Sequence, residues 1–173
     1  MRNSNISKFI RHLVAIIVVI SMMALSACSH KEKVSYKDFL GEENYESDAI
    51  AMVIDYIDGE EEPGVIYREV TDINGIIHQT EIPVCIFFYS GNATDRNGVF
   101  AGVEEISERL NGRVLIVAVD IMIHRELVDE YELIAVPDFV LFKNGTKASS
   151  FGASNYDYWT MTDVYNWLVL NKV

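Results

Sequence analysis

The chain has 173 residues, half of them hydrophobic, and a formal net charge of -12 at pH 7. This apolar content is sufficient for a buried core. The negative charge, with no cluster of basic residues in the body of the chain, excludes a surface that neutralises nucleic-acid phosphates. We therefore expect no nucleic-acid partner.

The N-terminus has the charge and hydropathy pattern of a secretory signal. Basic residues and no acidic residue lie before an apolar run at 13–25, which is shorter than the roughly 20 residues that a membrane-spanning helix requires. The run ends in Leu-Ser-Ala-Cys, which resembles a bacterial lipobox. We predict a lipoprotein signal peptide at 1–27 and lipidation of Cys28, with palmitate among its acyl chains, which anchors the chain to the extracytoplasmic face of a cell-envelope membrane. The alternative is an uncleaved signal anchor.

The next segments indicate a tether and a helix. Residues 28–47 are mostly polar, and we expect little order there. Apolar residues then recur at helical spacing, which predicts an N-terminal helix and linker over 48–64, ended by a Gly-, Glu- and Pro-rich stretch: Ile50, Val53, Ile54 and Ile57.

From residue 65 onward, strands alternate with helices. We predict a strand at 65–70, a short helix at 73–79 capped by Asp72 or alternatively a hairpin turning at Asn74-Gly75, and a fully buried strand at 84–89. An amphipathic helix then leads to a second buried strand, which together form a parallel βαβ unit. The remaining predicted elements are the helix at 99–110, the strand at 114–119, a short helix at 126–131, a hairpin of strands 139–142 and 147–151, and a helix at 160–171.

This order resembles the thioredoxin family over residues 65–173. The most similar stretches are 82–89, 103–106 and 135–145, the last containing Ala-Val-Pro before a strand and Lys-Asn-Gly after it. The resemblance implies an α/β thioredoxin-like three-layer sandwich with a mixed central sheet. It also implies that Pro137 is cis and that the backbone of Val136 pairs with an extended substrate.

The chain departs from the family where the family carries its chemistry. The resemblance places Ala93, Thr94, Asp95 and Arg96 at the Cys-x-x-Cys positions at the start of the first long helix. The buried carboxylate of redox members would fall at Phe87 and the lysine that often faces it at Ala118. Asp95 is expected at the helix start, with Asn92 or Thr94 as its cap. We predict no catalytic residue.

Other candidate sites are weaker. Cys85 lies in a buried strand and is predicted to be an inert core residue. The histidines lack partners at ligand spacing, so no metal site is predicted, and no cofactor motif is present. The resulting hypothesis is a membrane-tethered, non-redox domain that binds a protein or peptide. The alternatives are a thiol oxidoreductase that uses Cys85 or a partner's thiol, and a purely structural spacer. The predicted binding surface comprises Asn92, Ala93, Thr94, Asp95, Arg96, Val136 and Pro137.

Overall fold

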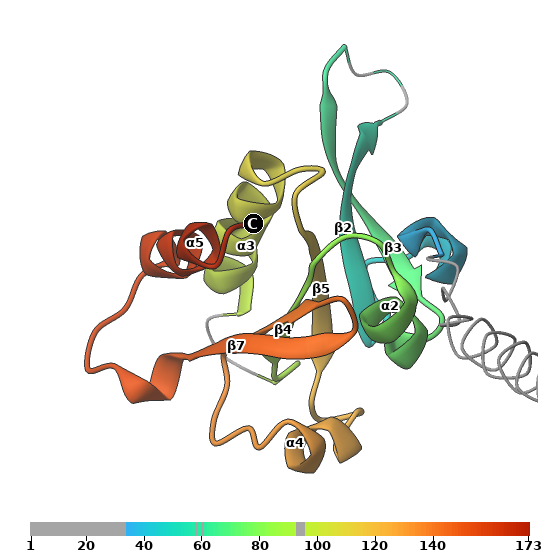
Figure 1. Ribbon diagram of the computed structural model, residues 1–173. Helices are drawn as coiled ribbons and strands as arrows, with labels where there is room; N and C mark the ends of the chain where they lie inside the picture. The colour runs from blue at the N-terminus through green and yellow to red at the C-terminus, as the bar shows by residue number, and fades with distance from the viewer. Residues whose placement is uncertain (1–33, 58, 60, 93–95) are drawn as a thin grey trace, which may run out of the picture. The chain divides into compact units, whose positions relative to one another are not determined.

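A seven-stranded mixed sheet, in the order β1-β3-β2-β5-β4-β6-β7, runs through the computed structural model (Figure 1). The structure describes residues 34–57, 59, 61–92 and 96–173, which belong to the second of two units into which the chain divides, 1–32 and 33–173. The predicted signal peptide and Cys28 lie outside the described residues. Among those described, no helix is long and apolar enough to cross a membrane.

The elements follow the predicted alternation from residue 65, with additional strands before it. In chain order they are η1 (Tyr36–Phe39), β1 (Leu40–Glu43), β2 (Ala49–Tyr56), β3 (Pro63–Val70), α2 (Ile73–Gln79), β4 (Val84–Tyr89), α3 (Arg96–Arg109), β5 (Leu115–Asp120), α4 (Glu126–Glu130), β6 (Asp138–Lys143), β7 (Thr146–Gly152), η2 (Ala153–Asn155) and α5 (Met161–Leu170).

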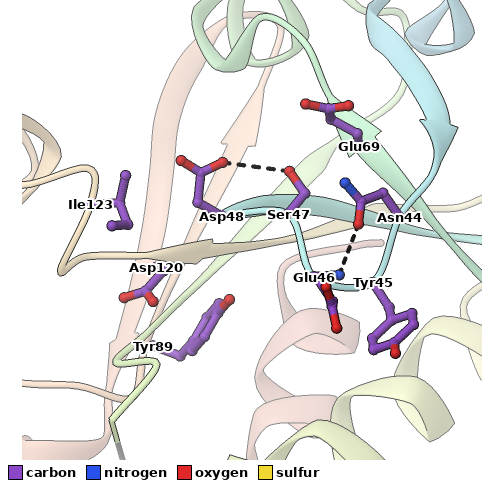
Figure 2. A pocket seen from close by; sticks show the side chains of 9 residues that line it. All are labelled: Asn44, Tyr45, Glu46, Ser47, Asp48, Glu69, Tyr89, Asp120 and Ile123. Atoms are coloured by element: carbon purple, nitrogen blue, oxygen red, sulfur yellow. Dashed lines mark hydrogen bonds between the residues drawn. The ribbon is translucent and has the colours of Figure 1, made fainter.

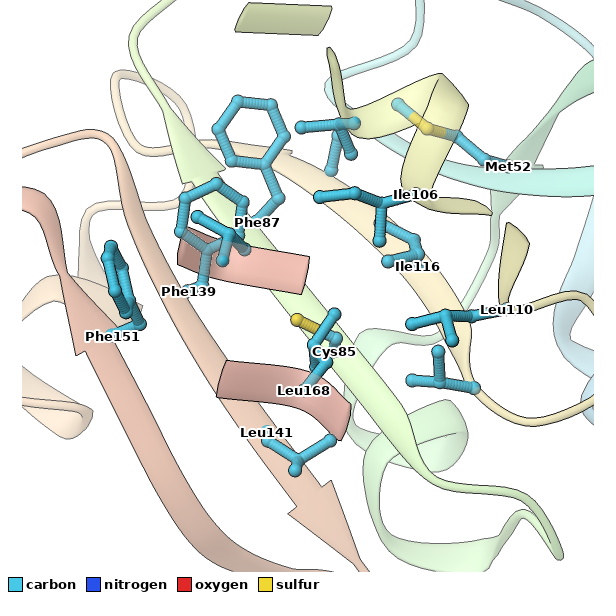
Figure 3. Close-up of a cluster of buried hydrophobic side chains, with 14 of the residues drawn as sticks. Met52, Cys85, Phe87, Ile106, Leu110, Ile116, Phe139, Leu141, Phe151 and Leu168 are labelled. Carbon is cyan, nitrogen blue, oxygen red and sulfur yellow. The ribbon is translucent and has the colours of Figure 1, made fainter. Parts of the chain in front are cut away.

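Strands β4, β5 and β6 form the centre of the sheet. β4 pairs in parallel with β5, as the βαβ pattern predicted, and antiparallel with β6. Alternate side chains point to two separate apolar clusters. One cluster packs beneath α3 and α5, and the other beneath α2 and α4. Figure 3 shows Cys85 inside the first cluster, which also contains Phe87 and Leu141. The predicted α/β sandwich with a mixed sheet is confirmed.

The predicted N-terminal helix over 48–64 is wrong. Residues 49–56 form strand β2, which pairs antiparallel with both β5 and β3. Ile50 and Met52 are almost fully buried on the α3 side, whereas Ala49 and Ala51 face the opposite cluster. The β-branched residues that suggested a helix are equally suited to a strand covered on both faces. The expected linker is instead the loop between β2 and β3.

The predicted tether over 28–47 also needs correction. Its C-terminal part is ordered, because β1 pairs antiparallel with β3, beginning with Leu40 opposite Val70. The Arg68 side chain donates a hydrogen bond of 2.7 Å from Nε to the Gly41 carbonyl oxygen. Residues 28–33 lie outside the part of the chain that the structure describes. The folded domain therefore begins well before residue 65.

Local signals identified α2 and the β6–β7 hairpin correctly. The Asp72 side chain accepts a 2.8 Å hydrogen bond from the Gly75 amide and so caps α2, and the alternative hairpin at Asn74-Gly75 is wrong. At the β6–β7 turn, Asn144 and Gly145 have φ values of 51° and 75°, as the Asn-Gly pair predicted for a tight hairpin.

Candidate functional site

Several loops meet at the edge of the sheet where β4 and β5 end. The parallel strands finish at Tyr89 and Asp120. Because β2 is antiparallel to β5 and β6 is antiparallel to β4, the first residues of β2 and β6 lie at the same edge. The loops before these strands carry Asp48 and Pro137. In open α/β sheets, ligands bind outside the carboxyl ends of the parallel strands.

The Val136–Pro137 peptide bond is cis, as the family resemblance implied. Both residues are half-buried, and the Val136 side chain packs against the cluster beneath α2 and α4. The Pro137 carbonyl oxygen accepts a 3.4 Å hydrogen bond from the Ala153 amide. Among the described residues, neither the N–H nor the carbonyl of Val136 makes a hydrogen bond.

The other part of the predicted binding surface is described only in part. Asn92 is exposed in the loop after β4, and α3 begins at Arg96. Ala93, Thr94 and Asp95 lie outside the described residues, so the predicted helix cap stays a prediction. The structure thus places Asn92 and the Val136–Pro137 bond in loops at the same edge, because Phe88 near the end of β4 pairs with Asp138 at the start of β6.

Cys85 is remote from this edge. It pairs with Leu141, near the opposite end of β4, and its side chain has no exposed surface. Burial raises the pKa of the Cys85 thiol far above its usual range, and the nearby Asp138 charge raises it further. A buried, protonated thiol is a poor nucleophile. The predicted role of Cys85 as a core residue agrees with this position.

A polar pocket of about 680 Å³ lies beside Tyr89 and Asp120 (Figure 2). Its far wall is the loop at 44–48, which sequence reasoning missed because it assigned 44–47 to the tether and Asp48 to the predicted N-terminal helix. Gly91 lies next to it, and a Cβ at this position would lie 2.3 Å from Asp120 Oδ2, so a larger residue would force the Asp120 side chain to move. The pocket is acidic, with carboxylates of Glu46, Asp48, Glu69 and Asp120 on its walls. Among the described residues, no group of three or more potential ligands is arranged to hold a metal ion.

The sequence profile of the thioredoxin family matches residues 65–159, more than half of the chain. This chain belongs to the thioredoxin family. A similar relative is the chloroplastic thioredoxin Y of Oryza sativa subsp. japonica, 26% identical over 76 residues, which are 44% of this chain and 45% of the relative. The chain thus matches less than half the length of that protein. The crystal structure of the germline-specific thioredoxin Deadhead from Drosophila melanogaster is 15% identical, with a TM-score of 0.47, and the match covers 54% of this chain and 83% of that one.

This thioredoxin-family domain has one more unusual polar residue at the candidate edge. Asp138 directly follows the cis proline and is only 8% exposed. Burial raises the pKa of its carboxyl group, while the Phe139 amide and the Lys147 charge lower it. Sequence reasoning missed Asp138. The available signal was an acidic residue at the first position of a strand that is otherwise apolar until its last residue, Lys143.

Proposed function

We propose that this chain is a lipid-anchored protein of the bacterial cell envelope whose thioredoxin-family domain binds an extended protein or peptide segment without thiol–disulfide chemistry. The observation that carries the proposal is the separation of two features of the domain. The cis Val136–Pro137 bond presents a backbone without hydrogen-bond partners among the described residues, whereas Cys85 is buried near the other end of β4.

The proposed mode of binding is the addition of a short strand. An extended segment pairs its backbone with the N–H and carbonyl of Val136, which supplies affinity that does not depend on sequence. Ile134 lies nearby in the chain and is 83% exposed, so it offers apolar contact to the side chains of the segment. No electron transfer is needed for this function, and the sequence supplies no second cysteine to the domain.

A site-specific crosslink tests the proposal in the bacterium that makes the chain. A photoreactive amino acid replaces Ile134 in one variant and Leu170 in another. The two positions are matched, since both side chains are aliphatic and they are 83% and 82% exposed, but Leu170 lies at the end of α5. We expect adducts with a defined polypeptide from position 134 only.

Pro137→Ala added to the position-134 variant provides the second arm. Alanine lacks the ring that fixes the φ angle of residue 137, so the backbone next to Val136 becomes less constrained and the adducts should fall at least tenfold while circular dichroism shows an intact fold. Equal adducts from positions 134 and 170, or adducts that persist unchanged in Pro137→Ala, would refute binding at this bond.

A further inference from the structure

Beside the cis bond, a small pocket of about 180 Å³ lies between the loop after α4, strands β6 and β7, and η2. Asp138 forms part of its wall, and the pocket also contacts Lys147, Ser150, Gly152 and Asn155. Exposed residues such as Glu132 and Ile134 line it as well. The pocket therefore adjoins the backbone to which we assign segment binding.

The Asp138 carboxylate is incompletely paired within this wall. Its Oδ1 atom is buried and accepts no hydrogen bond from the described residues. Lys147 lies in the same wall and its charge lowers the pKa of Asp138, but its 3.0 Å hydrogen bond runs from Nζ to the Tyr131 carbonyl oxygen, so it donates no hydrogen bond to Oδ1. A buried acceptor without a donor is unfavourable, and an added donor relieves the cost.

The position of the pocket relative to Val136 favours a side chain as that donor. Val136 packs into the cluster beneath α2 and α4, and Val140 points into the same cluster, so the alternation along β6 places Asp138 on this face of the sheet. A segment paired with Val136 directs every second side chain to that face. Two carboxylates, Asp138 and Glu132, and one cation, Lys147, line the pocket, so its wall carries a net negative charge that favours a positively charged group there.

We propose that this pocket receives a lysine or arginine side chain of the bound segment, with the ammonium or guanidinium group donating to the Asp138 carboxylate. The inference rests on the proposed function and adds selectivity for basic segments to it. A charge-assisted hydrogen bond in a buried position is stronger than a neutral one, so the basic residue contributes substantially to affinity.

Peptide binding to the full chain, purified in a nonionic detergent, tests this selectivity. Four fluorescent pools of random heptapeptides differ only in a fixed central residue: lysine, arginine, norleucine or glutamate. We expect the lysine or arginine pool to bind at least tenfold more tightly than the norleucine pool in fluorescence anisotropy, and the glutamate pool to bind most weakly.

Three variants assign this preference to the pocket. Asp138→Asn should abolish it, whereas Asp129→Asn, which changes an exposed carboxylate on α4, should leave it unchanged. Gly152→Ala keeps the charge but places a methyl group 3.2 Å from Asp138 Oδ2 and 2.9 Å from Asn155 Nδ2. It should reduce the preference severalfold, which separates occupancy of the pocket from any effect of Asp138→Asn on folding.

The outcomes separate this inference from the proposed function. Equal binding of all pools, abolished by Pro137→Ala, overturns the inference and leaves the function standing. If no pool binds, the proposed function fails. Whether the pocket binds a cation is then tested by titrating the chain with n-butylammonium and following the ¹³C signal of the Asp138 carboxyl group. A saturable shift that Gly152→Ala weakens supports a cation pocket, and no shift overturns it.

Discussion

Two residues on neighbouring strands show how burial controls titratable groups in this domain. Cys85 and Asp138 are both buried, and burial raises the pKa of each. The position of Cys85 was predictable, because it lies within a continuous apolar run that is typical of a central strand. Asp138 was not, because a polar residue at the first position of a strand is ordinarily solvated. The loop after α4, β7 and η2, which lie beside Asp138, come together only in the folded chain.

Cys85 should be unreactive in the folded chain and should make stability depend on alkaline pH. In the unfolded chain the thiol ionises near its ordinary pKa of 9.0, whereas the folded state retains the proton. The folded state therefore binds more protons, and its stability falls as pH rises through about 8 to 10, approaching a slope of about 1.4 kcal/mol per pH unit. Urea unfolding of a Cys28→Ser chain at several pH values measures this slope.

The matched control is the Cys28→Ser chain that also carries Cys85→Ala, in which this component of the slope should disappear. Ellman's reagent provides a second readout, since Cys85 is then the sole thiol of the Cys28→Ser chain. Labelling should require urea. Equally fast labelling with and without urea would contradict a buried thiol and would favour a redox role.

At the scale of elements, strand β2 is the instructive failure. Its apolar residues satisfy both a helical and an extended spacing, and the length of the run does not separate the two. The choice is made by tertiary pairing, because β2 lies between β3 and β5 and completes hydrogen bonding on both sides. In contrast, β4 and β5 have no polar interruption over most of their length, and α2 has a local cap. These three elements could therefore be predicted from their own residues, without information on tertiary pairing.

Truncation of two side chains distinguishes the strand from a helix at 49–56. Met52 is 2% exposed and lies in the α3-side cluster, so Met52→Ala should lower the free energy of unfolding by about 2 to 5 kcal/mol. Ile57 is 43% exposed just beyond β2, so Ile57→Ala should change it by no more than about 0.5 kcal/mol. A helix with Ile50, Val53, Ile54 and Ile57 on its buried face predicts a large cost at Ile57. Urea denaturation measures both free energies of unfolding. A larger loss of stability in Ile57→Ala than in Met52→Ala would refute the strand.

At the scale of the whole molecule, the sandwich was predictable from 65–173, and its N-terminal extension was not. Local patterns identify a βαβ unit and a hairpin, but they do not reveal that β1 and β2 widen the sheet through pairings distant in sequence. The same limitation applies to the sites. The cis proline lies in a recognisable motif, whereas both pockets are assembled from segments far apart in the chain, such as the loop at 44–48 beside Asp120.

The predicted lipid anchor is tested at Cys28. If Cys28 receives lipid, bacteria grown with radioactive palmitate should label the chain, and the labelled product should be shorter than the translated chain by the 27 residues of the signal peptide. Cys28→Ser should remove the label and leave the precursor uncleaved, because the processing enzyme acts on the lipidated cysteine. Cys85→Ser is the matched control, because it also removes one of the two cysteines of the sequence but keeps Cys28. It should retain the label. An unlabelled wild-type chain of full length would instead support a signal anchor, which holds the domain at the membrane by its apolar run rather than by acyl chains.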